Sequence, residues 1–188
     1  MTSHYKGRSE TFVSSKSANN KVLSLYNKIL EHAYSDSDYW YLGGNDDLLD
    51  RLYDFDDSDL MEMGNDLQNW SLNEVEIFIQ ALEVDYSASH DDLLPQRAYL
   101  RGFIMTLANQ YLHKEKYIVR NLFDPKDELL LGGFIQDRIL LEKIKNTLDN
   151  IEAAFESVPK EDEMIHYFLN TRFVLIKQTI TELLNVAS

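Results

Sequence analysis

The chain has 188 residues and a formal net charge of −14 at neutral pH, from 32 acidic and 18 basic residues. This charge argues against nucleic acid and against an anionic membrane surface as ligands, because both attract Lys and Arg, and it favours a basic partner. The sequence has no cysteine, which excludes disulfides, thiolate metal sites and a cysteine nucleophile. Hydrophobic residues make up 44%, as in globular proteins, and seven glycines and three prolines are few for a many-turned β fold.

Residues 1–18 are polar, net basic and without hydrophobic periodicity, which predicts a flexible N-terminal arm. Residues 19–188 are predicted to form one helical domain. The N-terminus lacks the apolar segment of a signal peptide, and no run approaches the roughly 20 apolar residues of a membrane span. We therefore expect a cytoplasmic protein that binds no membrane.

A first helix is predicted over residues 20–34, where apolar residues recur every three or four positions. The next segment, residues 36–66, is the most charged part of the chain and is called the acidic stretch below. It contains eleven acidic residues and one basic residue, Arg51, which leaves a net charge of −10. The acidic stretch therefore carries most of the charge imbalance of the protein.

Within the acidic stretch, residues 39–44 are predicted to be a loop, and Asn45 is predicted to cap a short helix that ends near Tyr53. Ser58 is the expected cap of a following helix whose buried side ends at Trp70. A continuous helix through the stretch would instead align four carboxylates on one face, because they are spaced three, four and three positions apart: Asp47, Asp50, Asp54 and Asp57.

The best specified helix start in the sequence lies at Ser71. Ser71 and Glu74 form a capping box, and Trp70 and Val75 can form the hydrophobic staple around it. Apolar periodicity predicts further helices over residues 92–111, 116–123, 125–132, 134–155 and 161–186. The protein is therefore predicted to be all-α. The expected architecture is an irregular bundle of about seven to nine helices with mostly antiparallel neighbours, or a solenoid-like stack of helix pairs.

Asp46, Asp47 and Asp50 match the DDxxD pattern, which resembles the aspartate-rich motif through which all-α isoprenoid synthases hold magnesium and diphosphate. The resemblance covers five residues, and of the basic pair that follows the motif in prenyltransferases only Arg51 is present. Pro95 follows the chain's other aspartate pair closely, so no second motif forms. The resemblance implies a magnesium-dependent all-α enzyme as an alternative function.

Other catalytic and metal-binding patterns are absent from the sequence or incomplete. Glu163 and His166 have the spacing of a di-iron helix, but that fold needs two such pairs. The acidic stretch lacks the ligand and glycine positions of a calcium loop, and the chain has neither a nucleophile elbow nor a phosphate-binding loop. We therefore assign no catalytic residue, no metal ligand and no cofactor, and expect a protein that is not an enzyme.

Aromatic residues beside carboxylates are typical of protein interfaces, because the rings supply buried area and the acids attract Lys and Arg. Packing of these rings in the core is the alternative. The predicted partner-binding residues are Asp36, Asp38, Tyr39, Trp40, Tyr41, Asp50, Asp54, Asp56 and Asp57. The favoured function is a bacterial immunity or antitoxin protein that occludes the active site of a basic partner, a cationic nuclease toxin. A helical adaptor or regulatory scaffold is the alternative.

Overall fold

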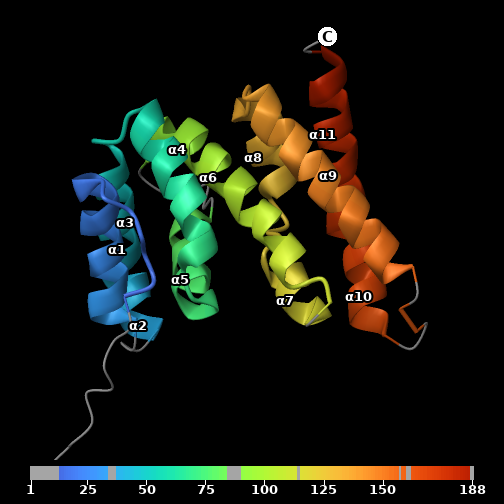
Figure 1. Cartoon of the computed structure of the whole chain (residues 1–188), viewed down its shortest axis with the longest axis horizontal. Helices are drawn as coiled ribbons and strands as arrows, with labels where there is room; N and C mark the ends of the chain where they lie inside the picture. The colour runs from blue at the N-terminus through green and yellow to red at the C-terminus, as the bar shows by residue number, and fades with distance from the viewer. Residues whose placement is uncertain are drawn as a thin grey trace, which may run out of the picture.

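The computed structural model describes residues 13–33, 37–83, 90–113, 115–156, 158–159 and 162–186. These residues form helices and no strand, which confirms the all-α prediction. Figure 1 shows the helices side by side, from α1 (Asn20–His32) at one edge of the molecule to α11 (Val174–Val186) at the other. None of the helices in this part of the chain is both long and apolar enough to cross a membrane.

Short turns join most of the helices. In the first half of the chain the helices are α1, α2 Ser37–Tyr39, α3 Asn45–Leu52, α4 Asp57–Asp66 and α5 Leu72–Leu82. In the second half they are α6 Leu94–Thr106, α7 Lys116–Asn121, α8 Asp127–Phe134, α9 Arg138–Phe155, α10 Glu163–Phe168 and α11. Two π-helical turns join consecutive helices, one between α2 and α3 and one between α10 and α11: Trp40–Gly44 and Leu169–Phe173.

Side-chain caps define several helix starts. The capping box at α5 is confirmed, because Ser71 Oγ accepts from the Glu74 amide and Glu74 Oε2 accepts from the Ser71 amide at 2.7 Å. The expected Ser58 cap of α4 is wrong. Asp56 caps this helix and forms a capping box with Asp59. The cap therefore lies two residues earlier than predicted, directly after the buried residue Phe55.

The start of α9 also differs from its prediction. Residue 134 ends α8, and α9 begins at Arg138 with Asp137 as its cap. The Oδ1 atom of Asp137 accepts from the Leu140 amide at 3.1 Å. The apolar spacing continues through Ile135, but Ile135 is extended and buried, so periodicity alone does not reveal the break.

Helix α6 is the centre of the fold, because it packs against α4, α5, α8 and α9. Its glycine, Gly102, lies against Ile135, Leu140 and Ile144, and a Cβ there would lie 3.1 Å from each. On the α4 side, a Cβ added to Gly64 would lie 2.5 Å from Cδ2 of the Phe103 ring. These two glycines set how closely the neighbouring helices approach α6.

We expect Gly64→Ala to lower the free energy of unfolding by about 1–2 kcal/mol, because overpacking against Phe103 outweighs the higher helix propensity of alanine. Gly133→Ala is the matched control, since a Cβ at Gly133 would meet nothing within 4 Å. Urea unfolding followed by circular dichroism measures both variants. Equal stability of the two variants would show that α4 and α6 are not closely packed here.

Part of the predicted N-terminal arm lies against α4. Ser15 is buried, its Oγ donates to Asp66 Oδ2 at 2.5 Å, and the Lys16 amide donates to Asp66 Oδ1 at 2.8 Å. The Ser14 amide donates to the Tyr26 hydroxyl at 2.8 Å, and Tyr26 in turn donates to Glu74. Residues 14–16 are therefore attached to the helical core, whereas residues 1–12 lie outside the described residues.

Candidate partner-binding face

The carboxylates of the acidic stretch fall into two groups in the structure. The first group is compensated by the chain's own donors. Asp59 accepts from Lys21 Nζ at 2.5 Å, from Asn19 Nδ2 at 2.6 Å and from the Asp56 amide at 3.0 Å. The hydrogen bond from Lys21 is the largest of the effects that lower the pKa of Asp59 to about 2. Asp47 similarly pairs with Lys28 at 3.1 Å.

The second group has no Lys or Arg partner in an ion pair among the described residues and lies where α3 ends and α4 begins; within it, Asp56 accepts from the Ser58 and Asp59 amides as the cap of α4. Four predicted site residues form it, and all are exposed: Asp50, Asp54, Asp56 and Asp57. Within the described part of the chain no Lys or Arg lies within ion-pair distance of these four carboxylates. We call these four residues the α3–α4 junction. A turn at residues 53–56 separates the two helices, as predicted, so the alternative of one continuous helix with four aligned carboxylates does not apply.

The other predicted site residues lie elsewhere. Asp38 is exposed on α2, which packs beside the C-terminal end of α1. The α3–α4 junction lies near the opposite end of α1, where Lys21 contacts Asp59. Asp36 and the side chain of Tyr41 lie outside the described part of the structure. The structure therefore does not gather all nine predicted residues on one face.

Trp40, one of the predicted partner-binding residues, lies in the core of the structure, where it is 4% exposed. The Tyr39 ring packs edge-on against it, with centroids 5.0 Å apart, and stacks on His32 at 3.9 Å. A Cβ on Gly44 would lie 2.9 Å from the Trp40 ring, so the missing side chain of Gly44 makes room for both rings. The core-packing alternative therefore applies to Trp40.

The DDxxD carboxylates point to different neighbours. Asp47 pairs with Lys28, whereas Asp46 and Asp50 flank His90, at 3.7 and 4.0 Å from its ring nitrogens. No group of three or more His, Asp or Glu residues among the described residues is arranged to hold a metal ion. The five-residue resemblance thus has no metal site to support it in this part of the chain.

His90 and Tyr53 connect the α3–α4 junction to α6. The Tyr53 hydroxyl donates to Asp92 Oδ1 at 2.7 Å and lies 3.1 Å from His90 Nδ1. The hydrogen bond to Asp92, followed by desolvation and the charge of Asp92, raises the pKa of Tyr53 to about 12. Tyr53 therefore stays protonated at neutral pH and holds Asp92 beside the start of α6.

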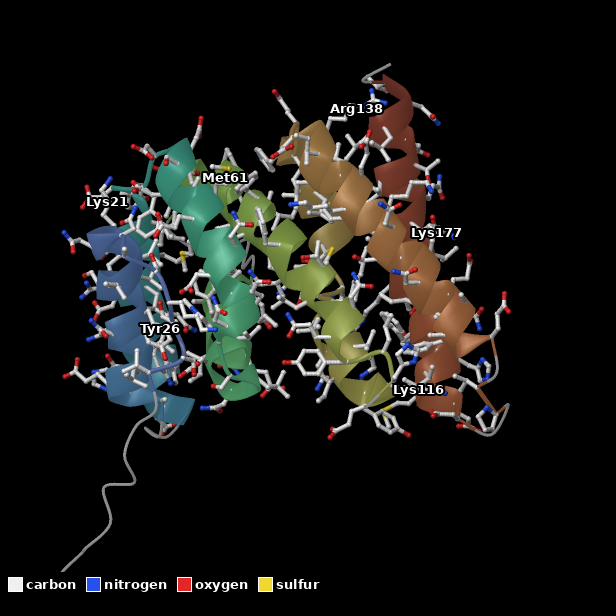
Figure 2. The ribbon with its side chains drawn as sticks, viewed as in Figure 1. Lys21, Tyr26, Met61, Lys116, Arg138 and Lys177 are labelled. Carbon is white, nitrogen blue, oxygen red and sulfur yellow. The ribbon has the colours of Figure 1, made fainter. Side chains whose placement is uncertain are left out.

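A groove of about 650 Å³ opens next to this cluster, between the start of α4, the start of α6 and the α8–α9 linker. Figure 2 shows Met61 and Arg138, the chain neighbours of Leu60 and Asp137, at the same end of the molecule. The groove is lined by Phe55, Asp57, Leu60, Asp92, Pro95, Gln96, Tyr99, Gly133, Phe134, Ile135, Gln136 and Asp137. This lining contains three carboxylates and no Lys or Arg.

Tyr99 lies between two of the groove's carboxylates. Its hydroxyl is 3.4 Å from Asp137 Oδ2. Burial raises the pKa of Tyr99, and the negative charges of Asp137 and Asp57 raise it further. The groove is therefore a region of negative potential with apolar and aromatic walls, which suits a cation more than an anion.

Sequence reasoning missed Asp92 and Asp137 as site residues. Asp92 was recognised only as a helix start, and Asp137 lies 80 residues beyond Asp57 in the chain. No local pattern relates these positions, because α6 and the α8–α9 linker bring them to Asp57 only in the folded chain. Comparison with protein-family models, with curated proteins and with solved structures finds no match for this chain, so the candidate site rests on its own residues.

Proposed function

We propose that this chain is a cytoplasmic binding protein that captures a basic protein through the α3–α4 junction. The observation that carries the proposal is the group of four exposed carboxylates there without a Lys or Arg partner in the described part of the chain. Like charges held close together destabilise a fold, and a cationic partner would relieve the repulsion. The groove carboxylates Asp92 and Asp137 extend the negative surface from the junction across α6.

The most concrete form of this function is a bacterial immunity or antitoxin protein. A nuclease binds phosphates in a groove rich in Lys and Arg, and carboxylates can occupy such a groove in their place. Long-range attraction speeds the encounter, and direct pairing then blocks access to the active site. The predicted residues Asp38 and Tyr39 on α2, and Asp36 and Tyr41, remain candidates for a wider footprint.

The test is the association rate of a purified cationic nuclease domain with two variants of the chain. The junction variant changes Asp50, Asp54 and Asp56 to Asn, which keeps a good cap at position 56. We expect its association rate constant to fall roughly tenfold at low salt, because three steering charges are lost. Stopped-flow fluorescence of Trp residues measures the rate.

The matched control removes three exposed charges at another place on the molecule. It changes Glu115, Glu156 and Glu163 to Gln; all three are exposed, and among the described residues none of their carboxylates caps a helix or forms an ion pair. Figure 2 shows Lys116, the neighbour of Glu115, at the opposite end of the molecule from Lys21. An equal loss of rate in both variants would mean that net charge, and not the junction, attracts the partner.

A helical adaptor is the second candidate, and an apolar surface favours it. Tyr117, Met164 and Tyr167 are exposed on the neighbouring helices α7 and α10, and Tyr167 is 67% exposed. An adaptor that used this surface would bind with little dependence on salt, because apolar burial is not screened. Binding that is insensitive to both salt and the junction variant would favour the adaptor.

A further inference from the structure

The groove between α4, α6 and the α8–α9 linker differs from the α3–α4 junction in having walls as well as charge. Asp57, Asp92 and Asp137 approach it from three separate elements. Between them lie the rings of Phe55, Tyr99 and Phe134, and Phe134 is 39% exposed. A ligand in this groove would meet carboxylates at its charged end and aromatic surface along its sides.

Arginine is the cationic side chain that fits these walls best. Its planar guanidinium can bind a carboxylate through two parallel hydrogen bonds and can stack on an aromatic face, whereas the lysine ammonium is a hydrated point charge. A guanidinium has five N–H donors and can serve more than one of the groove's carboxylates at once.

A second, more apolar groove of about 390 Å³ adjoins the first at Ile135 and Gln136, which line both. Its walls come from the end of α8, from α9 and from the C-terminal part of α11, and include Leu141, Leu183 and Val186. A segment that placed a cation in the first groove would therefore pass over Ile135 into apolar surroundings. The pair of grooves suits a cationic residue followed by an apolar one.

We propose that the first groove binds an arginine side chain of the basic partner, and that a large apolar residue next to this arginine occupies the second groove. This inference rests on the proposed function, since it names the contact that holds the captured partner in place. The α3–α4 junction speeds the encounter, and the groove slows dissociation.

The probe is a capped pentapeptide with an arginine followed by a leucine and glycine elsewhere, titrated into the ¹⁵N-labelled full chain. We expect changes in amide chemical shift at residues 57–60, 96–99 and 133–137 from the arginine, and near Leu183 from the leucine. Replacing the arginine with citrulline, which is neutral and nearly isosteric, should weaken binding at least tenfold. Replacing the leucine with glycine should abolish the shift changes near Leu183 and leave those near Asp57.

The groove variant changes Asp57, Asp92 and Asp137 to Asn, which can still cap α9 and accept from Tyr53. We expect it to bind the arginine peptide at least tenfold more weakly than the unaltered chain, with the Glu115, Glu156 and Glu163 variant as the control. Equal binding of the citrulline peptide, unchanged binding to the groove variant, or shift changes centred on Asp50 and Asp54 instead of the groove residues would each overturn the proposal.

Two experimental outcomes distinguish an error in the groove proposal from an error in the proposed function. If a cationic nuclease domain binds the unaltered chain and the groove variant with the same dissociation rate, the groove proposal is wrong and the proposed function stands. If the arginine peptide binds in the groove but cationic nuclease domains do not bind the chain, the arginine site stands and the proposed function is wrong.

Discussion

Replacing Asp127 with alanine is expected to lower the free energy of unfolding by about 3–5 kcal/mol, because the change leaves a buried arginine without its counter-ion. Arg101 on α6 is 1% exposed. Its Nε and Nη2 atoms donate to the two carboxylate oxygens of Asp127 at 2.8 and 2.7 Å. Burial opposes the charge of Arg101, but Asp127 outweighs this effect and the pKa of Arg101 is raised.

The double variant Arg101→Met with Asp127→Leu provides the control for this ion pair. Replacing both charges with apolar side chains avoids an unpaired buried charge, so the double variant should recover most of the lost stability. The recovery is incomplete, because Asp127 also accepts from the Asp124 amide and Arg101 donates to the Leu122 carbonyl. Urea unfolding measures all three forms. A loss below about 1 kcal/mol in Asp127→Ala would show that α6 and α8 are not joined by this pair.

Asp66→Ala is the second substitution with a large expected effect, about 2–3 kcal/mol of unfolding free energy. The buried carboxylate of Asp66 accepts from the Asn69 side chain and the Trp70 indole, both at 2.9 Å, in addition to Ser15 and Lys16. The alanine variant leaves these donors without their acceptor. It should also release residues 14–16 from α4, which limited proteolysis would detect. Resistance of the variant's N-terminal segment to proteolysis would contradict this account.

Asp66 also makes stability depend on pH in a defined direction. Burial opposes its charge, but hydrogen bonds from Ser15, Lys16, Trp70 and Asn69 outweigh burial and lower the pKa. A carboxylate with a lowered pKa stabilises the fold above its unfolded pKa of about 3.9, and this contribution is lost as the pH falls through the lower folded value. The unaltered chain should therefore lose more stability than Asp66→Ala when the pH is lowered below about 4.

Local features of the fold could be predicted from the sequence. The capping box at Ser71 and Glu74 was predicted correctly because all of its contacts lie within four residues. The cap of α4 was not, because Asp56 and Ser58 both suit the position and the choice depends on the burial of Phe55. The direction of the Trp40 ring depends on a π-helical turn and on Gly44, which periodicity does not predict.

Non-local features of the fold and of the candidate site could not be predicted. The Arg101–Asp127 pair joins residues 26 positions apart, and nothing in either segment marks the other as its partner. The groove likewise combines Asp57 with Asp92 and Asp137, which the sequence places only at the start of one predicted helix and inside another. The acidic stretch indicated the sign of the surface charge, but the fold decided which of its carboxylates are compensated and which are exposed.

The most direct measurement for the central claim is the association rate of a cationic nuclease domain with the unaltered chain and the junction variant, compared between about 10 mM and 150 mM salt. At 10 mM the Debye length is about 30 Å and at 150 mM about 8 Å, so steering by the α3–α4 junction acts fully only at low salt. We predict that at low salt the unaltered chain associates roughly tenfold faster than the junction variant. At high salt the association rates of the two proteins should converge. Identical rates of the two proteins at low salt would contradict the claim that the junction captures a basic partner.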